Sequence, residues 1–208
     1  MQALLAALGA YLIGSISFAV VVSRLFGLPD PRRYGSGNPG ATNVLRSGSK
    51  AAAAITLLGD AGKGGVTVLT VRALAPTLGL GEGVLAAAAL AAFAGHLYPV
   101  YFGFRGGKGV ATAFGILLAM NLLLAGAALL VFCAVVTATR YVSLASVLAA
   151  LTAAALAPWL FGWGPLALGV AAMALLIAWR HRANLQRLMA GSERKLGARR
   201  ESSPPEPG

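Results

Sequence analysis

The stretch "VATAFGILLAMNLLLAGAALLVFCAVVTAT", residues 110–139, contains no charged side chain. As one α-helix it would be about 45 Å long, which is too long for one crossing of a bilayer and too short for two full crossings. Asn121 lies near its middle, and Gly126 follows shortly after. We therefore expect two short helices that meet near Asn121, close to the outer face of a membrane.

The rest of the chain has the same apolar character. Hydrophobic residues make up 58% of the 208 positions and charged residues 11%, and the mean hydropathy is +0.76. A single soluble core of this length could not hide so much apolar surface, whereas a bilayer solvates it directly. The sequence therefore predicts an all-α, polytopic integral membrane protein, without internal repeats. The other apolar segments cover residues 3–22, 51–80, 83–103, 142–161 and 163–179.

The cations predict the topology. Lys and Arg outnumber Asp and Glu by 17 to 6, and they cluster at 24–50, at 105–108, at Arg140 and from Arg180 onward. Cationic loops face the cytoplasm, so an even number of crossings must separate these clusters. This predicts about seven transmembrane helices, some short or broken, with the N-terminus outside and the C-terminus inside. The cations occupy short loops instead of one basic face, so we expect no nucleic-acid partner.

The two ends of the chain indicate how far the transmembrane domain extends. No cation precedes the first apolar segment, which is read as a retained helix instead of a cleaved signal. Residues 197–208 form a charged tail rich in Pro and Ser, which is expected to be disordered. Residues 1–196 are then one transmembrane domain. Cys133 is the single cysteine, so no disulfide framework is possible, and its apolar neighbours predict a small buried side chain.

Residues 59–65, "GDAGKGG", are expected to interrupt the second span. Asp60 and Lys63 are spaced as neighbours on a helix, and ionisable groups at membrane depth are costly unless they are paired or line a wet cavity. Two interpretations stay open: a mutually neutralising structural pair, or a pair that shapes a site.

The first of three polar clusters is "RYGSGNPGATNVLR", residues 33–46. Its glycines allow backbone N–H groups to converge, and such nests bind anions. An arginine suited to phosphate and four polar side chains accompany them: Arg46, Ser36, Asn38, Thr42 and Asn43. The alternative is a set of plain turns. The density of donors favours an anion site.

The second cluster is "FRGGKGVAT", residues 104–112, which leads into an apolar helix. Glycines at a helix N-terminus combine free N–H groups with the positive end of the helix dipole, and Lys108 adds a charge. The pattern predicts phosphate binding, although the spacing is not that of the nucleotide P-loop. The alternative is an interfacial loop whose cations extend to the head groups. The glycines concerned are Gly106, Gly107 and Gly109.

The third cluster is "RHRANLQRLMAGSERK", residues 180–195, directly after the last span. Arg180, Asn184 and Arg187 share one helical face, and His181 lies beside it. Alone, such a helix is typical of a head-group anchor. With the other two clusters on the same side of the membrane, it would close a cationic pocket. His96 in "GHLYP" is read as a helix-end histidine that could also edge this pocket.

Together the motifs resemble a known family. "SGNPGATNVLR", the GDxxKG element at 59–64, "GHLYPV" with "FRGGKGVAT", and "RHRANLQRLMAGSE" occur in the order found in the bacterial acyl-phosphate:glycerol-3-phosphate acyltransferases, the PlsY family. The similarity extends from the first span to about Lys195. A departure is Arg105, where the family often has lysine, and this swap keeps the charge.

The resemblance implies an enzyme of the bacterial inner membrane with its active site on the cytoplasmic side. It would transfer a fatty acyl group from acyl phosphate to the 1-hydroxyl of sn-glycerol 3-phosphate, giving lysophosphatidic acid and inorganic phosphate for phospholipid biosynthesis. Neither acyl-CoA nor acyl-carrier protein would be used directly, and no metal or cofactor is expected. The partners would be both substrates, membrane lipid and, by a functional or physical link, the soluble acyl-phosphate-producing acyltransferase PlsX.

The resemblance also implies roles for individual residues. The expected catalytic residues are Ser36, Arg46, Lys108, His181 and Asn184. The expected substrate- or phosphate-binding residues are Gly37, Asn38, Thr42, Asn43, Gly106, Gly107 and Gly109. The expected structural residues are Asp60, Lys63, Gly191 and Glu193. The base that accepts the hydroxyl proton stays open between His181 and the phosphate of the donor, and we favour the phosphate.

Two other classes of function compete with this hypothesis. A transporter for an organic anion also needs cationic sites, but it would place them near the midplane between repeated halves, whereas these cations crowd one edge. A non-catalytic membrane scaffold could instead dock a soluble partner that makes acyl phosphate. Product formation by the purified protein distinguishes the three.

Overall fold

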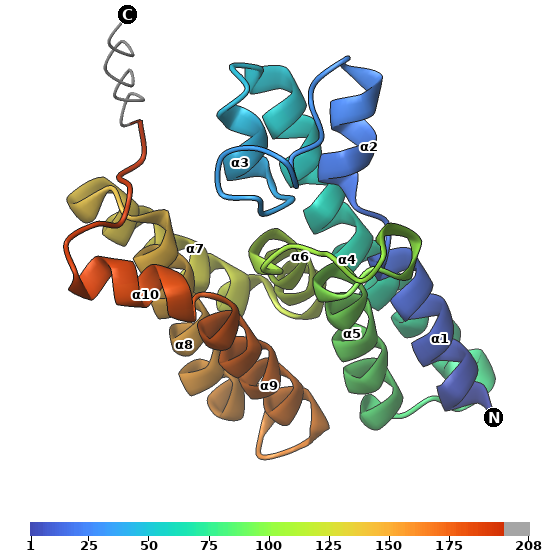
Figure 1. Ribbon diagram of the computed structural model, residues 1–208. Helices are drawn as coiled ribbons and strands as arrows, with labels where there is room; N and C mark the ends of the chain where they lie inside the picture. The colour runs from blue at the N-terminus through green and yellow to red at the C-terminus, as the bar shows by residue number, and fades with distance from the viewer. Residues whose placement is uncertain (198–208) are drawn as a thin grey trace, which may run out of the picture.

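The computed structural model describes residues 1–197, and these residues form helices and connecting loops (Figure 1). The first half contains α1 (Gln2–Gly14), α2 (Phe18–Leu25), α3 (Ala41–Leu45), α4 (Lys50–Leu78), α5 (Glu82–Leu97) and a 3-10 turn (Val100–Phe102). The second half contains α6 (Val110–Met120), α7 (Leu122–Thr139), α8 (Val142–Phe161), α9 (Pro165–Arg180) and α10 (Arg182–Met189). No strand occurs in residues 1–197, which confirms the all-α prediction.

The first apolar segment is broken. Helices α1 and α2 are separated at Ser15–Ser17, although together they cover one potential span from Gln2 to Leu25. A break leaves carbonyl groups without their helical partners, which is costly away from water. Lys63 of α4 relieves one of them, because its Nζ donates a hydrogen bond to the carbonyl oxygen of Ile16 at 2.6 Å.

The expected interruption of the second span was wrong. Helix α4 is continuous through 59–65, and within it Lys63 Nζ lies 2.8 Å from Asp60 Oδ1, one turn away. This pairing neutralises the two buried charges without distorting the backbone. The glycines serve helix contacts instead: a Cβ at Gly59 would collide with the ring of Phe18, and one at Gly64 with the backbone of α6.

Two helix pairs approach closely at glycines. Between α1 and α5, a Cβ at Gly14 would collide with the carbonyl of Ala92, and one at Gly95 with the carbonyl of Tyr11. Between α4 and α6, a Cβ at Gly115 would collide with the carbonyl of Ala61. Small residues at such positions allow backbones to approach and gain dispersion contacts, which is how membrane helices associate.

The long apolar stretch forms two helices, as predicted. Helix α6 ends at Met120 and α7 begins at Leu122. Asn121 caps α7, because its side-chain oxygen accepts a hydrogen bond from the N–H of Leu124 at 3.0 Å. At the other side of the joint, Arg72 Nη1 donates to the carbonyl oxygens of Ala119 and Met120, at 2.8 and 3.3 Å. Asn121 and Arg72 thus provide hydrogen-bond partners at both helix ends of the joint.

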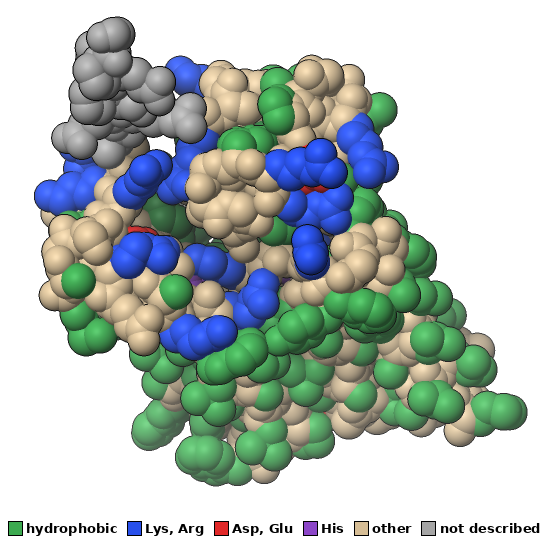
Figure 2. All heavy atoms as spheres, in the orientation of Figure 1, with side chains coloured by type: hydrophobic (Ala, Val, Ile, Leu, Met, Phe, Trp, Pro, Cys, Tyr) green, Lys and Arg blue, Asp and Glu red, His purple; other side chains and the backbone are tan. Residues whose placement is uncertain are grey.

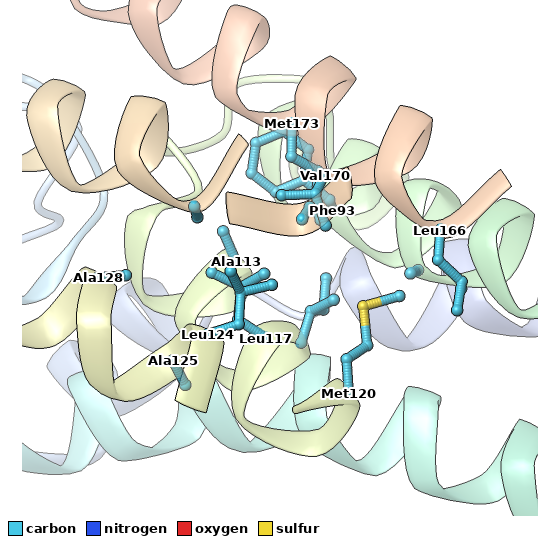
Figure 3. Close-up of a cluster of buried hydrophobic side chains, with 14 of the residues drawn as sticks. Phe93, Ala113, Leu117, Met120, Leu124, Ala125, Ala128, Leu166, Val170 and Met173 are labelled. Atoms are coloured by element: carbon cyan, nitrogen blue, oxygen red, sulfur yellow. The ribbon is translucent and has the colours of Figure 1, made fainter. Parts of the chain in front are cut away.

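The main core lies among α5, α6, α7, α8 and α9 (Figure 3). Phe93, Ile116 and Leu124 are fully buried there. Figure 3 shows Phe93 beside Val170 and Met173 of α9, with Ala113 and Leu117 of α6 facing this group. This core fixes α6 between the other helices, and the loop before α6 is positioned with it.

The outer surface separates by polarity. In Figure 2 the Lys and Arg side chains gather over the half of the molecule that holds α2, α3 and α10, and apolar side chains cover the other half. Among residues 1–197, four segments are long and apolar enough to cross a membrane, and α9 with α10, bent by 54°, would be a fifth. These findings describe a multi-pass membrane protein. The count of about seven spans and their orientation stay predictions.

Two smaller expectations have different outcomes. Cys133 is exposed on α7 instead of buried; the buried residues of α7, which are Leu124, Ala125 and Ala128, all lie in the first half of the helix. The predicted tail, residues 197–208, lies outside the described residues except for Gly197.

Candidate active site

A cavity of about 870 Å³ opens among the three polar clusters. All five residues expected to be catalytic line it: Ser36, Arg46, Lys108, His181 and Asn184. Asn38, Thr42, Asn43, Gly109, Asp60 and Glu193 line it as well. The cavity continues along α6, α7, α8 and α9 past apolar side chains such as Leu129, Phe132 and Met173. One space therefore joins a cationic end to an apolar end.

The first polar cluster is folded around Asn43. The buried amide of Asn43 donates to the carbonyl oxygens of Pro31 and Tyr34, at 2.7 and 3.1 Å, and its oxygen accepts the N–H of Ser36 at 3.0 Å. An amide has two N–H donors, and both are used here. The sequence had suggested that Asn43 donates to a bound anion. Because both of its amide hydrogens are used, it holds the loop in shape instead.

The glycines of this loop have distinct roles. Gly35 and Gly37 have positive φ values, +61° and +67°, which other residues rarely adopt. A Cβ on Gly35 would also collide with Asn43 Oδ1. Gly37 does not line the cavity, whereas Ser36 beside it does. The turn thus presents Ser36 while the amide of Asn43 is buried beneath it.

The second polar cluster lies against the end of α5. The N–H of Gly107 donates to the carbonyl oxygen of His96 at 3.1 Å. Gly106 and Gly107 are buried, and neither lines the cavity. A Cβ at Gly106 would collide with the carbonyl of His96. These two glycines allow close packing on α5, and Lys108 and Gly109, which follow, are the residues of the loop that reach the cavity.

Gly109 is the N-cap of α6 and has a φ of +85°. A Cβ there would collide with the ring of Phe93. The first N–H groups of a helix have no carbonyl partner within the helix, and the helix dipole adds positive potential at that end. Lys108 adds its ammonium group to the same place, so this end of α6 is suited to an anion.

The third polar cluster connects to the second through hydrogen bonds. Lys108 Nζ donates to Asn184 Oδ1, and Asn184 Nδ2 donates to Glu193 Oε1 at 2.6 Å. Glu193 also accepts from Ser143 Oγ of α8 at 2.8 Å and from Arg187 Nε at 2.9 Å. The carboxylate therefore fixes the amide of Asn184 with its oxygen toward Lys108. Ser143 was not predicted, because a serine in an apolar helix gives no sequence signal.

Burial and nearby cations control the charge of Lys108. Burial, opposed by the charge of Glu193 and reinforced by the charges of Arg187, Arg180 and Arg46, lowers the pKa of Lys108 to about 8. Burial by itself would raise the pKa of Glu193. The hydrogen bonds that its carboxylate accepts, of which the bond from Asn184 has the largest effect, outweigh burial and lower the pKa. Glu193 is therefore ionised at neutral pH, and most Lys108 side chains are protonated.

His181 lies at the bend between α9 and α10 and is buried. Its Nδ1 donates to the carbonyl oxygen of Ile177 at 2.8 Å, since a carbonyl can only accept. Burial, and then the charge of Lys108, lower the pKa of His181 to about 4. The imidazole is thus neutral at physiological pH, with Nε2 free to accept, and it is a weak base.

Of the remaining predicted residues, Asp60 and His96 line the cavity, and Lys63 and Gly191 do not. Asp60 and Lys63 form their pair in α4, and His96 Nδ1 lies 3.5 Å from Asp60 Oδ1. Asp60 and His96 line the cavity and Lys63 does not, so the pair is structural and also borders the site. Gly191, with a φ of +69°, forms the turn after α10 that returns the chain to Glu193. In residues 1–197 no three His, Cys, Asp or Glu side chains gather where they could hold a metal ion.

Comparison with known proteins assigns the family. A family model described as glycerol-3-phosphate acyltransferase matches residues 4–191. The chain belongs to the glycerol-3-phosphate acyltransferase family. Proteins named glycerol-3-phosphate acyltransferase are 52% identical over 202 residues in Paraburkholderia phymatum, covering 97% of this chain and 96% of that protein, and 53% identical over 196 residues in Thiobacillus denitrificans, covering 94% and 98%.

Solved structures support the same assignment. The crystal structure of PlsY (YgiH), an integral membrane glycerol 3-phosphate acyltransferase, in its glycerol 3-phosphate form matches with a TM-score of 0.87 and 38% identity, covering 95% of this chain and 96% of that one. The lysophosphatidic acid form matches with a TM-score of 0.85, 37% identity and coverage of 94% and 95%. The resemblance drawn from the motifs is confirmed, and this glycerol-3-phosphate acyltransferase is an integral membrane enzyme.

Proposed function

We propose that the polar end of the cavity is the active site, where this acyltransferase moves a fatty acyl group from acyl phosphate to the 1-hydroxyl of sn-glycerol 3-phosphate. The products are lysophosphatidic acid and inorganic phosphate, made for phospholipid biosynthesis. Neither acyl-CoA nor acyl-carrier protein serves directly as donor. The observation that carries the proposal is the continuity of one cavity from Lys108 and Arg46 to the apolar walls of α7, α8 and α9.

The two ends of the cavity suit the two parts of the donor. Acyl phosphate has a charged head and a long apolar tail. Lys108, Arg46 and the first N–H groups of α6 provide charge and hydrogen bonds for phosphate groups. Leu129, Phe132 and neighbouring apolar side chains provide a path along which the tail stays out of water. Glycerol 3-phosphate, which has no tail, binds at the polar end alone.

The chemistry requires orientation and charge stabilisation more than a nucleophile. The hydroxyl oxygen of glycerol 3-phosphate attacks the acyl carbonyl carbon, the bond from this carbon to the phosphate oxygen breaks, and phosphate leaves. An acyl phosphate already has a good leaving group, so no covalent intermediate is needed. Lys108 and Arg46 stabilise the negative charge that builds on the carbonyl oxygen and the departing phosphate.

The hydroxyl proton passes to the departing phosphate. His181 is the alternative base, but its lowered pKa, about 4, makes it a poor proton acceptor at neutral pH. A phosphate group, with a second pKa near 6, is the stronger base of the two. His181 serves instead as a neutral hydrogen-bonding group at the site through its Nε2.

We place the enzyme in the bacterial inner membrane with the cavity open to the cytoplasm. On the face seen in Figure 2, Lys and Arg side chains gather on the half of the molecule that contains the polar clusters, and cationic loops remain in the cytoplasm. A cytoplasmic opening gives access to water-soluble glycerol 3-phosphate. It also permits a functional or physical link to PlsX, the soluble acyltransferase that produces acyl phosphate.

The test is product formation by purified protein in lipid or detergent. With palmitoyl phosphate and labelled glycerol 3-phosphate, we expect labelled lysophosphatidic acid and one inorganic phosphate per product. No lysophosphatidic acid would overturn the function and would leave a transporter or a scaffold as the reading. Product from palmitoyl-CoA alone would overturn the assignment of the donor.

A further inference from the structure

Arg180, the last residue of α9, contacts the glycine loop before α6. Its Nη2 donates hydrogen bonds to the carbonyl oxygens of Gly106 and Gly107, both at 2.9 Å. Its guanidinium carbon lies 5.7 Å from the centre of the Tyr98 ring. The carbonyl oxygen of Tyr98 in turn accepts from the hydroxyl of Tyr11 in α1 at 2.7 Å. Arg180 therefore connects the loop to a residue that is itself fixed between α1 and α5.

The loop depends on such contacts because its glycines have no side chains. On one side it rests on α5, where the N–H of Gly107 donates to His96 and where no Cβ would fit. On the other side its carbonyls face Arg180. Among the described residues, Arg180 is the one side chain that hydrogen-bonds Gly106 and Gly107. Glycine loses more conformational freedom on folding than other residues, so this tether adds order on the side of the loop that does not rest on α5.

The orientation of the loop determines what it offers to the cavity. In a trans peptide, the N–H and C=O groups point in opposite directions. With the carbonyl of Gly107 directed at Arg180, the N–H of Lys108 is directed away from Arg180. Asn184, which lies four residues after Arg180, accepts a hydrogen bond from the ammonium group of Lys108. The segment from Arg180 to Asn184 thus holds both the backbone and the side chain of the loop.

Arg180 acts on the loop instead of on a substrate. It is absent from the residues that line the cavity, whereas Lys108, His181 and Asn184 line it. Both hydrogens of its Nη2 are directed at loop carbonyls. Two of its five N–H donors therefore hold the loop, and because Arg180 does not line the cavity, the geometry places it on the loop instead of on a phosphate group in the cavity.

We propose that Arg180 is a positioning residue of the acyltransferase, which fixes the Gly106–Gly107 peptides so that Lys108 and the N–H groups at the start of α6 face the phosphate of a substrate. This inference rests on the proposed function. It predicts that loss of the two hydrogen bonds lowers turnover while the helix bundle stays folded, because α9 is held to α5 and α8 by apolar contacts elsewhere.

The test compares Arg180→Met, Arg180→Lys and Arg182→Met. Methionine keeps much of the apolar volume but donates no hydrogen bond, whereas a lysine ammonium can donate to both carbonyls. Arg182 is a matched control: it is exposed, is two residues away, and contacts Trp179 instead of the loop. We expect kcat to fall at least 20-fold in Arg180→Met, to recover at least fivefold from that level in Arg180→Lys, and to stay within twofold in Arg182→Met.

Folding is monitored by the thermal unfolding midpoint in the same detergent. If Arg180→Met does not fold, Arg180→Gln takes its place under the same criteria, since its amide is too short to reach both carbonyls. A folded Arg180→Met with more than a third of the wild-type kcat overturns the proposal, and so does an Arg180→Lys no faster than Arg180→Met. If the wild-type protein forms no lysophosphatidic acid, the proposed function itself is overturned. Failure of the role of Arg180 and failure of the proposed function are therefore distinguishable.

Discussion

At the scale of single residues, Lys108 is the centre of the account. Its ammonium is held by Asn184, whose amide is oriented by Glu193, and Glu193 is held by Ser143 and Arg187. Each group in this chain restricts the next. The charge at the end of the chain is therefore fixed in place before a substrate arrives, and preorganised charge of this kind is the largest contribution in many enzymes.

We expect Lys108→Ala and Arg46→Ala each to reduce kcat at least 100-fold, since removal of one charge-stabilising donor typically costs about 10²–10³ in turnover. Both variants should remain folded and membrane-inserted. Arg105→Ala is the control, because Arg105 is an exposed cation of the same loop that does not line the cavity. It should keep at least half of the activity. Near-normal turnover in either site variant would show that the phosphate site has been misplaced.

The rate should also depend on pH through Lys108. The pKa of its ammonium is lowered to about 8, so the charged form is present below pH 8 and is lost as the pH rises through 8. Initial rates at saturating substrate should therefore decline about tenfold per pH unit well above 8. The charged groups around it are Glu193, Arg187, Arg180 and Arg46. A rate that stays constant to pH 10 would contradict the role of Lys108.

The sequence predicted which polar residues line the cavity better than it predicted their contacts. The five residues expected to be catalytic line one cavity, because polar and cationic side chains in an apolar chain stand out. Asn43 stood out for the same reason, yet both of its donors are used within the loop. Ser143 and the bonds from Arg180 to the loop could not be predicted, because they join segments that are adjacent only in the folded chain.

At the scale of elements, glycines decide how closely the helices pack. Gly115 faces the carbonyl of Ala61, whereas a Cβ at Gly126 of α7 would meet no atom of the described residues within 4 Å. We expect Gly115→Leu to destabilise the protein by separating α4 from α6, with overpacking that costs about 1–3 kcal/mol or more. The thermal unfolding midpoint in detergent should fall clearly. Gly126→Leu, the matched control, should leave it nearly unchanged, and equal midpoints for the two variants would refute this view of the α4–α6 contact.

The elements that depend on apolar length could be predicted, and those that depend on packing could not. The joint at Asn121 followed from a stretch too long for one crossing, and the structure places it there. The glycines at 59–65 predicted a break, but in the continuous helix α4 they leave room for Phe18 and α6 to pack closely against it. The break at Ser15–Ser17 was missed, since it is supported by Lys63, a residue distant in the sequence.

At the scale of the whole molecule, the account depends on three loops meeting at one face. The loops are separated by long apolar helices, and the core around Phe93 and Val170 sets the distances between them. In Figure 1 the loop with α3, the loop before α6, and α10 surround a common region. The cations of these segments on one side of the molecule agree with a cytoplasmic opening (Figure 2).

The most direct test of this claim is thiol labelling at Leu45, which lines the cavity and is 40% exposed. Cys133, exposed on α7, is first replaced by alanine, and Leu45→Cys is compared with Arg33→Cys, an exposed position outside the cavity lining. With an impermeant maleimide, both should react only from the cytoplasmic side. Glycerol 3-phosphate should slow labelling at position 45 at least fivefold and leave position 33 unaffected. Labelling of position 45 from the outer side, or at a rate that glycerol 3-phosphate does not change, would contradict the account.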